Sequence, residues 1–226
     1  MSTSKLESLA SAMAEITLRE GLAPFGTGCV SVFDRDANLL LLKRLCSTPE
    51  ATQPSEIIEV HPLPGTPLEP EGTRGFELER SLHEAIYRAF QPVTAALHFH
   101  SPSATAWSQA GRDLPCFGTL HASSFKGVIP CTRPLTTAEL CSKESPTLVI
   151  ASTIVSALLD RELSPGEMPG ILIRHDGAMA WGASIEECLH NAGRMEAVAA
   201  LAIQTLALNP AAQQIPPRLL RLHQPF

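Results

Sequence analysis

Residues 94–102 read Thr-Ala-Ala-Leu-His-Phe-His-Ser-Pro, and this stretch decides how the rest of the chain is interpreted. Its apolar first half predicts a short buried strand that ends in His98 and His100. Because side chains two positions apart on a strand share a face, both imidazoles can point at one spot. Ser101 and Pro102 predict a helix start, with Ser at the N-cap and Pro at the first helical position. The stretch could hold two metal ligands at a sheet edge, but an H-x-H pair is also found with rings that cap carbonyls or face solvent.

Composition bounds the class of protein. The chain has 226 residues, 44% of them hydrophobic, and a formal net charge of -6, which suits one globular domain spanning residues 1–226. It contains no Lys/Arg run, so we expect no nucleic-acid partner. It contains no apolar run of about 18 residues and no signal peptide, so we expect no membrane partner and a cytoplasmic location. The six cysteines lack ligand-like spacing and are expected to be reduced thiols.

Strand and helix patterns alternate along the chain, with a hairpin signal near the N-terminus and a Pro/Gly-rich loop at 61–75. The Ser184–Glu187 capping box predicts the start of a long last helix. We expect an α/β fold whose mixed or antiparallel sheet lies between helix layers. The predicted helices are 4–20, 79–90, 102–110, the later part of 147–160, and 184–208; the predicted strands are 29–33, 39–43, 57–60, 94–100, 170–174 and 178–181.

Three further features can join the histidine pair, namely Glu79, His121 and the His175-Asp176 pair. Glu79 opens the helix that leads into the ligand strand, and its carboxylate could accept a proton or bind a metal, although an acid there also suits the helix dipole. His121 follows the next helix and is a candidate acid–base group, or else a buried structural histidine. His175 and Asp176 follow the 170–174 strand, where a neighbouring strand would supply a third ligand. Two histidines from one strand and one group from another leave an open position, as in a catalytic metal site.

A family resemblance adds to this interpretation. The run HFHSPSATAWSQAGRDLPCFGTLHASSFKGVIPCTRPLT at 98–136 resembles the signature of the class II aldolase/adducin family, and most resembles its L-ribulose-5-phosphate 4-epimerase branch. The similarity resumes in GILIRHDGAMAWG at 170–182 and covers most of the chain. The resemblance implies a mainly antiparallel sheet of nine strands between helix layers. It also implies a homotetramer and a divalent metal held by three histidines.

Carried over by position, His98 and His100 match the first two metal ligands, and Glu79 matches the acid that acts as base or metal partner. The third ligand falls on Asp176, with His175 one place earlier, and either residue could take the role. We expect zinc, while an oxygen ligand would also suit iron, manganese or cobalt. The expected catalytic residues are Glu79 and His121; the expected substrate contacts are Gly28, Cys29, Lys43 and Ser123.

Departures from the family pattern shape the functional hypothesis. Ser123 stands where the epimerases carry an aspartate, and their C-terminal tyrosine has no counterpart. Glu77-Leu78 and Gly28-Cys29 replace the phosphate-binding residues, and a carboxylate there would repel a phosphate. We therefore expect a metal-dependent carbon–carbon lyase, an aldolase or decarboxylase that acts through a metal-stabilised enolate on a small non-phosphorylated substrate. The alternatives are a sugar-phosphate 4-epimerase with altered acid–base residues, or a catalytically degenerate member with a binding or assembly role.

Overall fold

The computed structural model of the protein describes residues 3–45, 57–60, 76–141 and 146–224. They form one six-stranded sheet whose strands are β1 (Gly28–Asp34), β2 (Leu39–Arg44), β3 (Ile57–Val60), β4 (Ala95–Phe99), β5 (Gly170–Leu172) and β6 (Ala178–Gly182). The strand order is β3-β2-β1-β4-β6-β5, and every neighbouring pair is antiparallel. The expected antiparallel sheet is confirmed, although the described residues supply six strands rather than nine.

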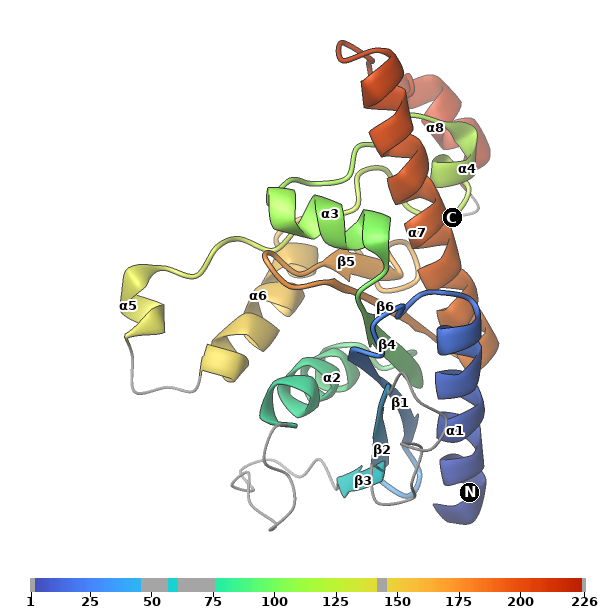
Figure 1. Cartoon of the computed structure of the whole chain (residues 1–226), viewed down its shortest axis with the longest axis vertical. Coiled ribbons are helices and arrows are strands. Elements are labelled where there is room, and N and C mark those ends of the chain that lie inside the picture. Colours follow the sequence, from blue (N-terminus) through green and yellow to red (C-terminus); the bar gives the residue numbers. More distant parts are fainter. Residues whose placement is uncertain (1–2, 46–56, 61–75, 142–145, 225–226) are drawn as a thin grey trace.

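Helices cover both faces of the sheet, which confirms the predicted α/β class. They are α1 (Thr3–Arg19), α2 (Glu77–Ala89), α3 (Pro102–Ala110), α4 (Thr119–Ala122), α5 (Thr137–Leu140), α6 (Pro146–Leu159), α7 (Ile185–Leu208) and α8 (Pro217–His223). Helices α1 and α7 lie on one side of the sheet, and α2 and α6 lie on the other (Figure 1). Among the described helices, none combines the length and apolar character needed to cross a membrane.

The side chains of β1 alternate between the side of the sheet that α1 covers and the side that α2 covers. Val32 points to the α1 side, where it packs in a small apolar cluster with Leu6 and Leu41. Cys29 and Ser31 have the opposite parity and point to the α2 side. On that side, Ser31 contacts two α2 side chains through its hydroxyl group. Cys29 and Ser31 of β1 therefore face α2.

Strand β4 lies in the middle of the sheet and carries His98 on the α2 side. His98 pairs with Cys29 of β1 and with Met179 of β6, so strands on both sides fix its backbone. Gly28 adopts φ +122°, and a Cβ built there would overlap the carbonyl oxygen of His98. Only glycine suits this position, because a side chain would require both a disfavoured backbone conformation and displacement of β4.

The predicted start of α3, with Ser101 at the N-cap and Pro102 at the first helical position, is confirmed, but the capping contact comes from another helix. Ser101 occupies the N-cap position, but its side chain makes no capping hydrogen bond. Glu196 of α7 takes this role, because its carboxylate accepts from the Ser101 hydroxyl at 2.6 Å and from the backbone N–H groups of Ser103 and Ala104. Helix α7 thereby holds the segment that immediately follows His100.

Several local predictions need correction or fall outside the structure. The expected 170–174 strand ends at Leu172, because the chain turns from Ile173 to Gly177. Helices α4, α5 and α8 were not predicted; α5 begins with a capping box between Thr136 and Glu139. The predicted 61–75 loop lies outside the described residues.

Candidate metal centre

Three side chains converge where β4 ends and the turn between β5 and β6 begins. His98, His100 and Asp176 each offer a ligand atom within 4.8 Å of the other two. The Nε2 of His100 lies 2.9 Å from Asp176 Oδ1, and the Nε2 of His98 lies 3.4 Å from Asp176 Oδ2. We call these three residues the outer group.

The outer group has the properties that a divalent metal requires. The Nε2 of His98 is buried and has no hydrogen-bond partner among the described residues. It faces an imidazole and a carboxylate, and nitrogen and oxygen donors of these kinds are common zinc ligands. The side chains of His100 and Asp176 are 22% and 27% exposed, which leaves an open side for a small molecule. Two imidazoles and one carboxylate therefore fit a divalent ion with a free coordination position.

His98 lies between two carboxylates, which changes its protonation when no metal is bound. Burial disfavours the charged imidazolium, but Glu79 and Asp176 outweigh burial and raise the pKa of His98 to about 10. Burial also disfavours both charged carboxylates, yet contact with the histidines lowers the pKa of each acid below its ordinary value. A metal ion bound at Nε2 would replace the proton that His98 otherwise carries there.

The turn between β5 and β6 decides whether His175 or Asp176 faces the histidine pair. His175 adopts φ +64°, its side chain is exposed, and it accepts a hydrogen bond from Arg174 Nε at 3.4 Å. Asp176 points to His98 and His100 instead. A Cβ at Gly177 would lie 2.5 Å from the carbonyl oxygen of Phe99, so glycine permits this close approach. The structure therefore places Asp176, and not His175, in the outer group.

Glu79 contacts the ring nitrogen of His98 that points away from the outer group. Its two carboxylate oxygens lie 3.0 and 3.1 Å from His98 Nδ1. The Oε2 atom also lies 3.7 Å from Nε2 of His83, one helical turn further along α2. A carboxylate that binds the second nitrogen of a ligating histidine fixes the tautomer and the orientation of the ring. In this geometry Glu79 would support His98 as a metal ligand.

The predicted substrate contacts Gly28, Cys29 and Lys43 do not share one face. Cys29 is fully buried on the α2 side, where its thiol, Glu79 and His83 offer ligand atoms within 4.8 Å of one another. Lys43 is paired with Val30 and has the opposite parity, so its side chain projects to the α1 side. The structure does not bring Lys43 into the site, while Gly28 adjoins it through its backbone.

His121 and Ser123 belong to a different part of the molecule. His121 lies on α4, and Ser123 directly follows this helix. Helix α4 contacts α7 and α8 (Figure 1). The His121 ring packs edge-on against Phe125 and borders a cavity of about 220 Å³ with Leu201 of α7. Burial lowers the pKa of His121 to about 4. The Ser123 hydroxyl donates to the Leu120 carbonyl within the same turn. Neither residue joins the outer group within this chain.

The sequence pattern gave no role to Ser31, His83 and Tyr87, although all three are connected to the site. The Ser31 Oγ lies 2.6 Å from His83 Nδ1 and 2.7 Å from the Tyr87 hydroxyl. A signal was available, because positions 79, 83 and 87 follow each other at four-residue intervals on one helix face.

Comparison with curated proteins overturns the functional hypothesis. The chain is 34% identical over 205 residues to the L-ribulose-5-phosphate 4-epimerase UlaF of Salmonella paratyphi B, which covers 91% of this chain and 87% of the relative. The same enzyme of Salmonella choleraesuis matches at 34% identity with the same coverage. The expected lyase acting on a non-phosphorylated substrate is therefore wrong. Differences at a few positions, such as Glu77 and Cys29, say less about function than 34% identity over 91% of the chain.

Solved structures share the fold. An L-fuculose 1-phosphate aldolase aligns over 99% of this chain and 96% of its own, with a TM-score of 0.74 and 16% identity. The L-fuculose-1-phosphate aldolase from Thermus thermophilus aligns over 94% of this chain and 100% of its own, with a TM-score of 0.64 and 19% identity. The family model described as the class II aldolase and adducin N-terminal domain matches residues 7–203. The chain belongs to the class II aldolase and adducin family.

Proposed function

We propose that this protein is a metal-dependent sugar-phosphate 4-epimerase that interconverts L-ribulose 5-phosphate, or a closely related pentulose phosphate, with its C4 epimer. The observation that carries the proposal is 34% identity to the L-ribulose-5-phosphate 4-epimerase UlaF over 91% of the chain. The convergence of His98, His100 and Asp176 supports it from the structure. We further propose that residues 1–226 act as one domain.

The outer group suits a divalent ion, and zinc is the ion that we propose. Zinc accepts imidazole and carboxylate ligands together and keeps an open position in catalytic sites. The carboxylate of Asp176 also makes the group suitable for manganese or iron. A bound ion would supply a Lewis acid for the oxygens at the ketone end of the substrate.

The chemistry of the substrate fits this site. In a 2-ketopentose 5-phosphate, the C4 hydroxyl is in the β position relative to the C2 carbonyl. The C3–C4 bond can therefore break by a reverse aldol reaction and form again on the opposite face of the aldehyde. No electron is gained or lost overall, and the C4 hydroxyl proton is removed and returned. The site therefore needs a proton carrier and a way to hold both fragments.

The residues of this chain divide these tasks. The outer group would orient the ketone end of the substrate at its partly exposed side, where His100 and Asp176 lie. Glu79 would support His98 from behind. Glu79 is 14% exposed and hydrogen-bonded to His98, so we propose that it acts through that ring. The resemblance aligns Ser123 with an acid of the epimerases, and Ser123 lies away from the outer group within one chain, so we propose that another residue carries the proton at C4.

We also propose that the chain assembles into a homotetramer. Exposed apolar side chains concentrate on α4, α7 and α8, where His121 and Ser123 lie, and they include Leu120, Leu201, Leu208 and Leu222. Apolar side chains gathered at one end of a molecule are typical of an interaction surface. Light scattering coupled to size exclusion measures the mass of the assembly, and a monomer at micromolar concentration would contradict this proposal.

The direct test is epimerisation by the purified, metal-loaded protein. L-ribulose 5-phosphate is the substrate, and the C4 epimer is detected by proton NMR. His100→Ala should lower the rate about 100-fold or more, because even the loss of a group that supports a ligand lowers activity about 10- to 100-fold. His175→Ala is the matched control and should stay within about twofold of the unchanged protein. A folded, metal-loaded protein that gives no C4 epimer would refute the proposed function.

A further inference from the structure

A chain of buried polar contacts runs behind the outer group, and the proposed reaction uses only its last members. We propose that His83, held by Ser31 and Tyr87, is a positioning residue that fixes Glu79 against His98 and thereby sets the affinity of the outer group for its metal ion. The inference rests on the proposed function only in taking His98 and its two neighbours as the metal ligands.

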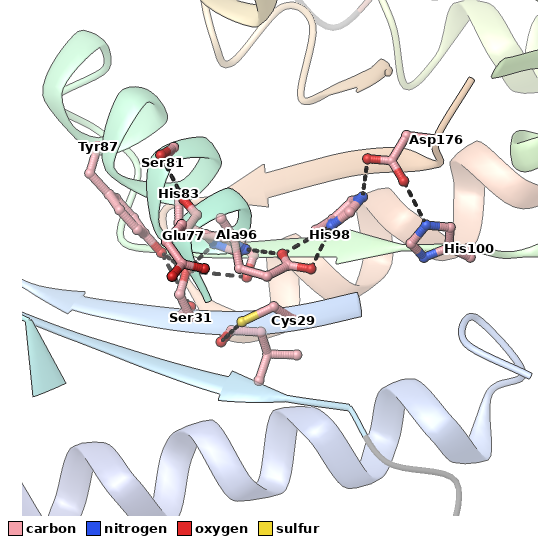
Figure 2. A network of polar contacts seen from close by, with 12 residues as sticks. Cys29, Ser31, Glu77, Ser81, His83, Tyr87, Ala96, His98, His100 and Asp176 are labelled. Atoms are coloured by element: carbon pink, nitrogen blue, oxygen red, sulfur yellow. Dashed lines mark hydrogen bonds and ion pairs between the residues drawn. The ribbon is translucent and has the colours of Figure 1, made fainter. Parts of the chain in front are cut away.

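The first step is the attachment of the His83 ring. Its Nδ1 lies 2.6 Å from the Ser31 hydroxyl, which in turn lies 2.7 Å from the Tyr87 hydroxyl. The Tyr87 hydroxyl also donates to the Ser31 carbonyl at 3.2 Å. All three side chains are buried, and they come from β1 and α2, two elements fixed by the core (Figure 2). Rotation of the ring would leave buried polar groups unpaired, which is costly.

The second step is the contact from His83 to Glu79. With Nδ1 engaged by Ser31, the other nitrogen, Nε2, points to Glu79 and lies 3.7 Å from its Oε2. This distance is too long for a hydrogen bond, so the contact is electrostatic. The Nε2 atom has no hydrogen-bond partner among the described residues. The Glu79 carboxylate is thus confined between His83 and the Nδ1 of His98.

The third step connects Glu79 to the metal ligands. The carboxylate holds His98 Nδ1 at 3.0 and 3.1 Å, so the opposite nitrogen, Nε2, is aimed at Asp176 and the outer group. Removing a group that directly supports a metal-ligating histidine typically lowers metal affinity about 10- to 100-fold. His83 contacts Glu79 and not the ligating histidine itself, so we expect its removal to lower metal affinity by the smaller of these amounts, about tenfold.

Three substitutions of His83 test the roles of its two ring nitrogens separately. In His83→Gln the side-chain amide reaches the place of Nε2 and can donate to Glu79. In His83→Asn it reaches only the place of Nδ1, beside Ser31, and His83→Phe keeps the ring shape without a polar atom. We expect zinc affinity to fall about tenfold in the Asn and Phe variants and to stay within about threefold in the Gln variant. A purely structural role would instead rank the variants by their stability.

The measurement is zinc affinity by competition with a chromophoric chelator, on variants whose circular dichroism and thermal melt confirm folding. His121→Phe is the matched control, because it makes the same substitution at a buried histidine outside the network, and it should bind zinc like the unchanged protein. His100→Ala should lose zinc, because it removes a proposed ligand.

The outcomes separate this inference from the proposed function. If the His83 variants bind zinc normally while His100→Ala does not, the positioning role is refuted and the outer group stands. If His100→Ala also binds zinc normally, the outer group is not the metal site and the proposed function itself fails. If Cys29→Ala loses zinc as fully as the His83 variants, the ion lies between Cys29, Glu79 and His83, which also refutes the positioning role.

Discussion

Replacement of Glu196 by alanine tests how the fold holds the segment that follows the proposed metal ligands His98 and His100. This carboxylate of α7 accepts hydrogen bonds from the Ser101 hydroxyl at 2.6 Å, from Ser103 N at 3.0 and 3.1 Å, and from Ala104 N at 2.9 Å. It thus satisfies two of the N–H groups at the start of α3 that have no partner within the helix. Its negative charge also lies at the positive end of the helix dipole.

The expected cost follows from these contacts. Loss of an N-cap costs about 0.5–2 kcal/mol, and loss of a hydrogen bond to a charged group costs about 1.5–3 kcal/mol. Glu196 is only partly buried, so water can reach some of the freed donors, and the costs do not add fully. We expect Glu196→Ala to lower the free energy of unfolding by about 2–3 kcal/mol. Glu196→Gln keeps one carbonyl acceptor without the charge and should lower it by about 1 kcal/mol.

Urea unfolding of the metal-free protein measures this change, provided that the denaturant slope stays constant. Glu15→Ala, at an exposed position of α1, is the control and should change stability by less than about 0.5 kcal/mol. Because His100 immediately precedes Ser101, zinc affinity should also fall in Glu196→Ala. A stability change as small as that of the Glu15 control would refute the stabilising role of this contact.

Three further predictions concern the site itself. Asp176→Asn should lower zinc affinity about tenfold or more, whereas His175→Asn should leave it within about twofold, as measured by chelator competition; equal effects would contradict the observed turn. Gly28→Ala should lower the free energy of unfolding by at least about 2 kcal/mol, because its Cβ would overlap the His98 carbonyl, and a urea midpoint equal to that of the unchanged protein would contradict this contact. In the metal-free protein, the pKa of His98 is raised from 6.5 to about 10, so its contribution to stability is complete below about pH 6.5 and is lost as the pH rises through 10. The difference in the free energy of unfolding between the unchanged protein and His98→Gln should therefore shrink over that pH range. A difference that stayed constant would refute the ion pair.

Much of the fold could be predicted because, in many segments, the local sequence pattern and the packing around the segment favour the same structure. The predicted helix at 4–20 is observed as Thr3–Arg19, and the predicted strand at 39–43 as Leu39–Arg44. Apolar residues at the right period dominate such segments, so local preference and burial favour the same structure. The sequence does not predict helix α8, because Pro216 precedes it, Pro217 opens it and the surrounding tail is polar, although proline is favoured at a first helical position.

The candidate site shows the same division between local patterns and folded surroundings. His98 and Glu79 could be proposed as site residues because a strand end and a helix start are visible in the sequence. The role of Ser31 required the pairing of β1 with β4, which sets Cys29 opposite His98 and Ser31 opposite Ala96. Such a register depends on residues far apart in sequence, and a shift of one residue would turn Ser31 to the other face. No motif within β1 alone specifies that choice.

The choice between His175 and Asp176 shows why ligand identity is hard to infer from composition. Histidine is the commoner metal ligand, and family spacing left both residues open. The turn decides between them, because Asp176 N donates to the Ile173 carbonyl and Ile173 N donates to the Gly177 carbonyl, which closes a tight reversal. In this reversal His175 takes the left-handed conformation and faces solvent. The aspartate then follows with its carboxylate toward His100. The turn geometry therefore decides which of the two side chains could bind a metal here, because it directs Asp176 toward the histidines and His175 outward.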